Sequence, residues 1–158
     1  MEITESETPM KIRDVMESKV IAVRPDTTYE EAGRLMIEHD VSGLPVTDAE
    51  GRLVGLISEK DLFKALYPGE AEFAVALDES YQDQEMQEAN VNDMRKHLVS
   101  RYMTKRVLTL APDTPVLKAG GIMLAHHVHR IPVVDNGKLV GIVSREDIYG
   151  AILKKHFA

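Results

Sequence analysis

The 158-residue sequence contains no cysteine, which excludes disulfide bonds, thiolate metal sites and cysteine nucleophiles and is typical of a reducing compartment. No hydrophobic run approaches the roughly 20 residues that a membrane-spanning helix needs. The first residues, Met1 to Glu7, are acidic, whereas a secretion signal is basic and then hydrophobic. We therefore expect a soluble, cytoplasmic protein with no membrane partner.

Positive charge is also scarce, because 19 Lys and Arg face 26 Asp and Glu, for a net charge of −7. Most of the excess lies in residues 68–98, which hold eight acidic and two basic residues. The remainder is nearly neutral and can accept an anionic ligand, whereas a nucleic-acid groove needs a clear basic excess. We expect no nucleic-acid partner.

Motifs for catalysis are missing as well. The sequence has no nucleophile elbow, HExxH motif, P-loop or paired-carboxylate pattern, so we expect no enzymatic activity. His126, His127 and His129 suggest a metal site, but they have no cysteine or acidic partner at a defined offset. His126 and His39 are better explained as helix-end residues, and we expect no metal.

An internal duplication is the most informative feature that is present. An offset of 87 residues aligns Pro25-Asp26-Thr27 with Pro112-Asp113-Thr114, and an offset of 86 aligns Gly55 with Gly141. Many further identities follow in the same order. The chain is therefore a repeated unit of about 55 residues, with a longer acidic connection between the copies.

Each copy predicts the order β-α-β-β-α. Thr27-x-x-Glu30 indicates a capping box for the first helix, and in the second copy Thr114 would be the N-cap before Pro115. Asn136-Gly137 indicates a tight hairpin turn. The strands are expected at 20–23, 44–47 and 53–57, and again at 107–110, 131–134 and 139–143.

A unit of this size has little core of its own, so the two copies are expected to pack on each other. Helix faces such as Leu35/Met36 and Ile122/Met123 would remain to be covered. These leftover faces predict a homodimer.

With both copies aligned, the chain resembles a tandem pair of CBS domains, the module named after cystathionine β-synthase. The resemblance implies an α+β fold of two pseudo-symmetric β-α-β-β-α repeats, packed sheet to sheet as one CBS pair. The repeats would span 10–67 and 99–158, with a tail at 1–9 and an acidic, partly helical insert at 68–98 that the family pattern lacks. The matching segments are Val15-Met16, Tyr102-Met103, the two Pro-Asp-Thr helix entries, 39–46, 127–133, 55–61 and 141–147.

Both copies contain the motif Gly-x-x-Ser-x-x-Asp. Its serine and aspartate are Ser58 and Asp61 in the first copy and Ser144 and Asp147 in the second. By spacing alone, each pair is a capping box for the helix that follows. The same helix end can also bind an anion. In CBS pairs that bind adenosine ligands, the matching serine contacts phosphate and the aspartate contacts the ribose, and both interpretations remain open.

His129-Arg130 precedes a strand, and in family members that bind AMP, ADP or ATP a His-Arg at this place reaches the phosphates. The first copy has Ser42-Gly43 there, without charge. The aliphatic residues of the first strands would flank the adenine. The resemblance thus implies one site of Ser58, Asp61, Val107, Leu108, His129 and Arg130, and a second of Val20, Ile21, Val41, Ser42, Ser144 and Asp147.

The sequence therefore predicts a regulatory module that binds an adenine nucleotide, without a catalytic cofactor, and signals to a separate effector protein. S-adenosylmethionine or a dinucleotide is an alternative ligand. The competing hypothesis is a ligand-free dimerisation scaffold, in which the Ser and Asp pairs only cap helices.

Overall fold

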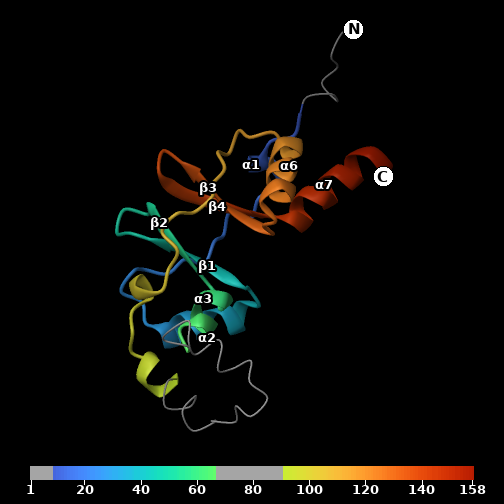
Figure 1. Cartoon of the computed structure of the whole chain (residues 1–158). Coiled ribbons are helices and arrows are strands. Elements are labelled where there is room, and N and C mark those ends of the chain that lie inside the picture. Colours follow the sequence, from blue (N-terminus) through green and yellow to red (C-terminus); the bar gives the residue numbers. More distant parts are fainter. Residues whose placement is uncertain (1–8, 67–90) are drawn as a thin grey trace, which may run out of the picture. The chain divides into compact units, whose positions relative to one another are not determined.

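The computed structural model describes residues 9–66 and 91–158, which form two compact units (Figure 1). The β3–β4 unit comprises Met1–Val20, Glu50–Leu53 and Leu108–Ala158, and the β1–β2 unit comprises Ile21–Ala49 and Val54–Val107. Most of the predicted insert at 68–98 lies outside the described residues, and its end is helical at 91–94. Among the described residues, no helix is both long and apolar enough to cross a membrane.

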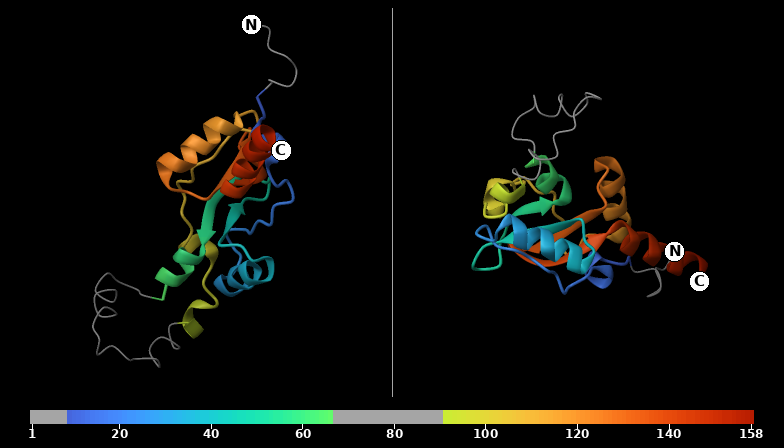
Figure 2. Two further views of the ribbon diagram at one scale, coloured as in Figure 1. Left: turned by 90° about the vertical axis from the view of Figure 1, so that its right-hand side faces the viewer. Right: turned by 90° about the horizontal axis from the view of Figure 1, so that it is seen from below.

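The β3–β4 unit is a two-stranded antiparallel sheet with helices packed on it. Asn136 and Gly137 join the strands with φ angles of 51° and 82°, the left-handed pair that a tight type I′ turn requires. Helices α6 and α7 lie side by side (Figure 2). Its elements are α1 (Ile12–Val15), α6 (Val116–His126), β3 (Arg130–Asp135), β4 (Lys138–Ser144) and α7 (Arg145–Phe157).

The core of this unit lies between the hairpin and the helices. Ile131 and Val143 are paired in the sheet and fully buried, and Met123 of α6 packs against the same cluster. Met123 therefore does not belong to an outward helix face, and the predicted role of this residue in a dimer contact is wrong. The cluster is Ile12, Leu110, Val116, Ala119, Met123, Ile131, Val133, Val143 and Ile148.

The β1–β2 unit repeats this plan, with α2 and α3 packed together (Figure 1). Met36 is buried in its core at 4% exposure, so it too is unavailable for the dimer contact that the helix pattern predicts. Its elements are α2 (Tyr29–His39), β1 (Gly43–Thr47), β2 (Leu53–Ser58), α3 (Glu59–Lys64) and η2 (Val99–Arg101). Its core is Val23, Ala32, Met36, Leu44, Val46, Ile57, Leu62 and Val99.

The first predicted strand of each repeat is reduced to one parallel bridge, Val23 with Val46 and Leu110 with Val133. The Val23 N–H donates to the Pro45 carbonyl at 2.9 Å, and the Val23 carbonyl accepts from Thr47 at 2.9 Å. A proline follows two residues later in each repeat and has no N–H to continue the ladder.

The first helix of each repeat begins one residue later than predicted. Thr28, not Thr27, is the N-cap of α2, and its hydroxyl accepts from the Glu31 N–H at 3.2 Å. The Thr27 hydroxyl instead accepts from the Arg24 N–H at 2.9 Å. In the second repeat the N-cap is likewise Pro115 rather than Thr114.

The leading segment of each repeat belongs to the unit of the other repeat. Glu17 forms an antiparallel bridge with Ile142 in the β3–β4 unit, through hydrogen bonds of 2.8 and 2.9 Å. Thr104 forms the corresponding bridge with Leu56 in the β1–β2 unit, with both bonds at 2.9 Å. Each unit therefore contains the main part of one repeat and the leading segment of the other.

Candidate ligand-binding site

The two Ser and Asp pairs form capping boxes, as their spacing predicts. The Asp61 N–H donates to the Ser58 hydroxyl at 3.1 Å, and the Ser58 N–H donates to Oδ2 of Asp61 at 2.9 Å. Ser144 and Asp147 make the same two bonds, at 2.9 and 3.1 Å. Both interactions satisfy N–H groups at a helix start.

Capping does not use the whole carboxylate. Only Oδ2 of Asp61 and of Asp147 accepts these bonds, and within the described residues Oδ1 of each accepts none. Both aspartates are half-buried, so they keep contact with solvent. A ligand hydroxyl can therefore donate to Oδ1 while the helix cap stays intact, and the two interpretations of these residues are compatible.

The helix that carries Asp61 is held by Tyr29 of α2, whose hydroxyl donates to the Leu62 carbonyl. The Tyr29 ring meets the Tyr102 ring edge to face, with centroids 6.0 Å apart. Burial, and after it the neighbouring Tyr102, raises the pKa of Tyr29 above its ordinary value of 10.0. Tyr29 therefore stays protonated at neutral pH and holds α3 through this hydrogen bond.

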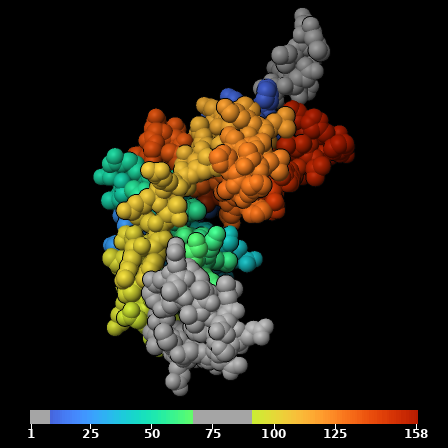
Figure 3. Space-filling model, viewed as in Figure 1, coloured from blue at the N-terminus to red at the C-terminus, as the bar shows by residue number. Residues whose placement is uncertain are grey.

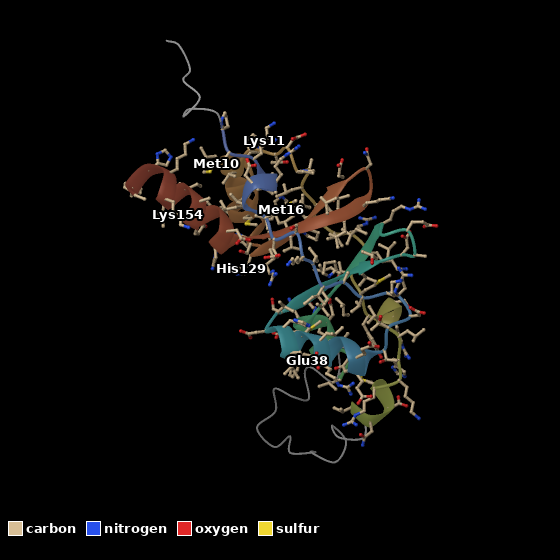
Figure 4. All side chains as sticks on the ribbon, turned by 180° about the vertical axis from the view of Figure 1, so that it is seen from behind. Met10, Lys11, Met16, Glu38, His129 and Lys154 are labelled. Atoms are coloured by element: carbon tan, nitrogen blue, oxygen red, sulfur yellow. The ribbon has the colours of Figure 1, made fainter. Side chains whose placement is uncertain are left out.

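Basic side chains gather at the open end of the β3–β4 hairpin. Arg130 is paired with Ser144 across the sheet, and the Arg145 N–H donates to the His129 carbonyl at 2.7 Å. Both His129 and Arg130 are exposed, and Figure 4 shows His129 at this end. Here the structure brings together residues of both predicted sites, His129 and Arg130 of the first and Ser144 and Asp147 of the second.

Sequence reasoning missed Arg145. It is half-buried, and its guanidinium carbon lies 6.0 Å from the centroid of the Tyr149 ring, which indicates a cation–π contact. The available signal was a basic residue directly after Ser144, where the first repeat has Glu59.

The matching positions of the β1–β2 unit are Ser42, Gly43 and Glu59, none of which is a cation. The Glu59 N–H donates to the Ser42 carbonyl at 2.8 Å, which places Ser42 next to the Ser58 cap. Val41 is half-buried and Ser42 is exposed. Glu59 stands where the other unit has Arg145 and Lys60 where it has Glu146, so the two helix starts carry the same charges in reverse order.

The four site residues of the first predicted strands lie where the chain passes from one unit to the other, between Val20 and Ile21 and between Val107 and Leu108. All four are partly exposed. The predicted sites each draw residues from both units, and that grouping stays a prediction.

The β3–β4 unit also contains a groove of about 730 Å³ along α7. Met10 and Val15 form one wall, and Figure 4 shows Met10 beside the helix that carries Lys154. Asp147 lines this groove as well as capping the helix. The α7 residues of the groove are Glu146, Asp147, Gly150, Ala151, Lys154 and Lys155.

The histidines behave as helix-end residues. His39 ends α2 and His126 ends α6, as predicted. In residues 9–66 and 91–158, no group of three or more His, Asp or Glu could hold a metal ion.

The chain is similar to known proteins over nearly its whole length. The model of the CBS domain family matches residues 12–68 and 99–154. A 17.7 kDa protein from the bps2 3′ region of Acidianus ambivalens is 34% identical over 147 residues, 92% of this chain and 75% of that protein.

Similar solved structures include ligand complexes. The structure of CBSX2 from Arabidopsis thaliana in complex with AMP has a TM-score of 0.69 and 31% identity, covering 91% of this chain and 96% of that one. The CBS domain pair of protein MJ0100, in complex with 5′-methylthioadenosine and S-adenosyl-L-methionine, has a TM-score of 0.68 and 26% identity, covering 94% and 99%.

Proposed function

Because the chain belongs to the CBS domain family, as a tandem pair of CBS domains, we propose that it is a regulatory module that binds an adenine nucleotide. One observation carries the proposal. Each unit holds a Ser and Asp cap with a carboxylate oxygen to spare, and the exposed Arg130 supplies a cation. AMP bound to CBSX2 and S-adenosylmethionine bound to MJ0100 support the adenosine part.

The residues match the parts of a nucleotide in turn. A carboxylate oxygen can accept from both hydroxyls of a ribose, and a serine hydroxyl can bond to a phosphate oxygen. Arg130 can make two parallel hydrogen bonds to a phosphate. Arg145 adds a second positive charge, and the exposed His129 ring can form a hydrogen bond to a phosphate oxygen. S-adenosylmethionine carries a sulfonium cation, so these residues favour AMP, ADP or ATP over it.

We assign the ligand contacts as the sequence predicts them. The second set has no cation at Ser42, and we expect it to prefer a ligand with fewer phosphates. The first set is Ser58, Asp61, Val107, Leu108, His129 and Arg130, and the second is Val20, Ile21, Val41, Ser42, Ser144 and Asp147.

The proposed output is regulatory rather than catalytic. A homodimer would respond to the nucleotide and act on a separate effector protein. We expect no hydrolysis of ATP, because the sequence has no P-loop or other catalytic motif.

Calorimetric titration of the full chain with AMP, ATP, adenosine and S-adenosylmethionine tests the function. We expect the nucleotides to bind and to raise the midpoint of thermal unfolding, because a ligand that binds only the native state stabilises it. If none of the four ligands binds or raises the midpoint, the dimerisation scaffold is the correct function. Preference for S-adenosylmethionine over AMP would contradict the assignment of the cations.

A further inference from the structure

Helix α3, which carries Asp61, is too short to be stable by itself. It spans Glu59–Lys64, and isolated helices shorter than about 12 residues are marginal in water. The capping box of Ser58 and Asp61 fixes its start. Leu62, the residue after Asp61, lies near its end, where carbonyl groups have no partner within the helix. The Tyr29 hydroxyl of α2 supplies that partner, so side chains hold α3 at both ends.

The position of the Tyr29 hydroxyl is itself fixed. The Tyr29 N–H donates to the His97 carbonyl at 2.8 Å, and the Tyr102 hydroxyl oxygen lies 2.6 Å from Nδ1 of His97. The Tyr102 ring in turn contacts the Tyr29 ring edge to face. His97 and Tyr102 belong to a surface segment of the β1–β2 unit that is yellow in Figure 3. This segment and α2 therefore orient the hydroxyl toward α3 together.

The second repeat has the same backbone contact but not the hydroxyl. Val116 occupies the position of Tyr29, at the offset of 87 residues. Its N–H donates to the Met10 carbonyl at 2.9 Å, in the same way that the Tyr29 N–H donates to His97. The Val116 side chain is buried in the core of its own unit and has no polar group to offer to a neighbouring helix.

The helix that carries Asp147 does not need such a donor. Ile148 occupies the position of Leu62, at the offset of 86 residues. Helix α7 continues for 13 residues, so the Ile148 carbonyl lies within the run of helical hydrogen bonds. Only α3 therefore depends on a side chain of another element at this position.

We infer that Tyr29 is a positioning residue for the first set of ligand contacts, and that its hydroxyl holds α3 so that Oδ1 of Asp61 faces the ribose. This inference rests on the proposed function and names a group that controls its affinity. Oδ2 of Asp61 is already committed to the cap. Because a hydrogen bond weakens steeply as its angle closes, a tilt of α3 would weaken the bond from the ribose to Oδ1. Asp147 in the second set has no such dependence.

Tyr29→Phe tests the role of the hydroxyl, because it keeps the ring that contacts Tyr102. Calorimetric titration of the full chain, at a temperature where both proteins are folded, should show AMP and adenosine each bound about fivefold more weakly at the first set. Both ligands weaken because both carry the ribose. Val116→Ala is the matched control at the equivalent position. It should lower the midpoint of thermal unfolding by opening a cavity in the core, yet leave the AMP affinity unchanged.

Combination with the aspartate substitutions assigns the effect to one site. With Asp61→Asn, Tyr29→Phe should cause no further loss of AMP affinity, because the carboxylate oxygen that it positions is gone. With Asp147→Asn, the loss caused by Tyr29→Phe should remain. A loss that persists in full with Asp61→Asn, or one that Val116→Ala reproduces, would overturn the inference.

Hydrogen exchange without ligand tests the hold on α3 separately. Tyr29→Phe should speed exchange of the α3 amides at least about fivefold and leave those of α7 unchanged. Unchanged exchange in α3 would overturn the inference regardless of any ligand. If the wild type binds neither AMP nor adenosine, the proposed function fails and this inference fails with it. If the wild type binds both and Tyr29→Phe binds them equally well, this inference alone is wrong.

Discussion

Met16 lies so close to Gly141 that a side chain at position 141 has no room. A Cβ built on Gly141 would be 2.6 Å from the Met16 sulfur and 3.0 Å from the Glu17 carbonyl oxygen. Gly55 repeats this relationship with Met103, at 2.8 Å. The leading segment of each repeat therefore crosses a strand of the other repeat at a glycine.

Gly141→Ala should destabilise the protein. The methyl group would push against a backbone carbonyl as well as a flexible side chain, and overpacking of this kind typically costs about 1–3 kcal/mol. Urea unfolding should show a lower midpoint for this variant and for Gly55→Ala. Gly121→Ala is the control, because nothing lies within 4 Å of a Cβ there and alanine favours the helix. Equal stability of Gly141→Ala and wild type would contradict the close packing.

Local signals in the sequence predicted much of the fold. The Ser58 and Ser144 caps and the Asn136-Gly137 turn were predicted because each depends on residues within four positions of one another. The exchange of Met16 and Met103 between units could not be predicted this way, since it depends on contacts more than 40 residues apart in the chain.

Helix periodicity predicted that Met36 and Met123 lie on the apolar faces of their helices, but not which part of the protein covers those faces. Both residues are buried within their own units, because the hairpins supply enough apolar surface to enclose them. The cation at Arg145 was missed for a related reason. Its proximity to His129 follows from the pairing of β3 with β4, not from local spacing.

Tyr29→Phe should lower stability at neutral pH by about 1 kcal/mol, because the Leu62 carbonyl loses its donor. The raised pKa of Tyr29 means that its contribution is fully present below about pH 10 and is lost as pH rises from there through the raised pKa. Urea unfolding at pH 8 and pH 10.5 measures this. The difference between wild type and variant should shrink at the higher pH, whereas Tyr149→Phe, at an exposed tyrosine, should show little pH dependence.

Substitutions of Asp61 separate its two roles. Asp61→Ala removes the carboxylate half of the capping box and leaves the Ser58 N–H without its acceptor, which should cost about 1 kcal/mol of stability, together with nucleotide affinity. Asp61→Asn keeps an oxygen for the Ser58 N–H, so we expect nearly wild-type stability but weaker binding of both AMP and adenosine. Thermal unfolding and calorimetry on the same samples measure the two effects. Glu38→Gln, at an exposed residue of α2, is the charge control. Wild-type affinity in Asp61→Asn would mean that Asp61 is only a cap.

Arg130→Ala should weaken AMP and ATP binding and leave adenosine binding almost unchanged. A charge-assisted hydrogen bond contributes about 1.5–3 kcal/mol, which corresponds to a loss of roughly 10- to 100-fold in affinity. Lys138→Ala, at an exposed cation that begins β4 in the same hairpin, should change neither affinity.

Combining Arg130→Ala with Asp61→Asn or Asp147→Asn identifies the aspartate that contacts the same ligand as Arg130, because substitutions that affect one bound molecule are coupled. We expect coupling with Asp61. Coupling with Asp147 instead would move the phosphate contacts to the second set of residues, and equal losses for AMP and adenosine would show that Arg130 does not contact phosphate.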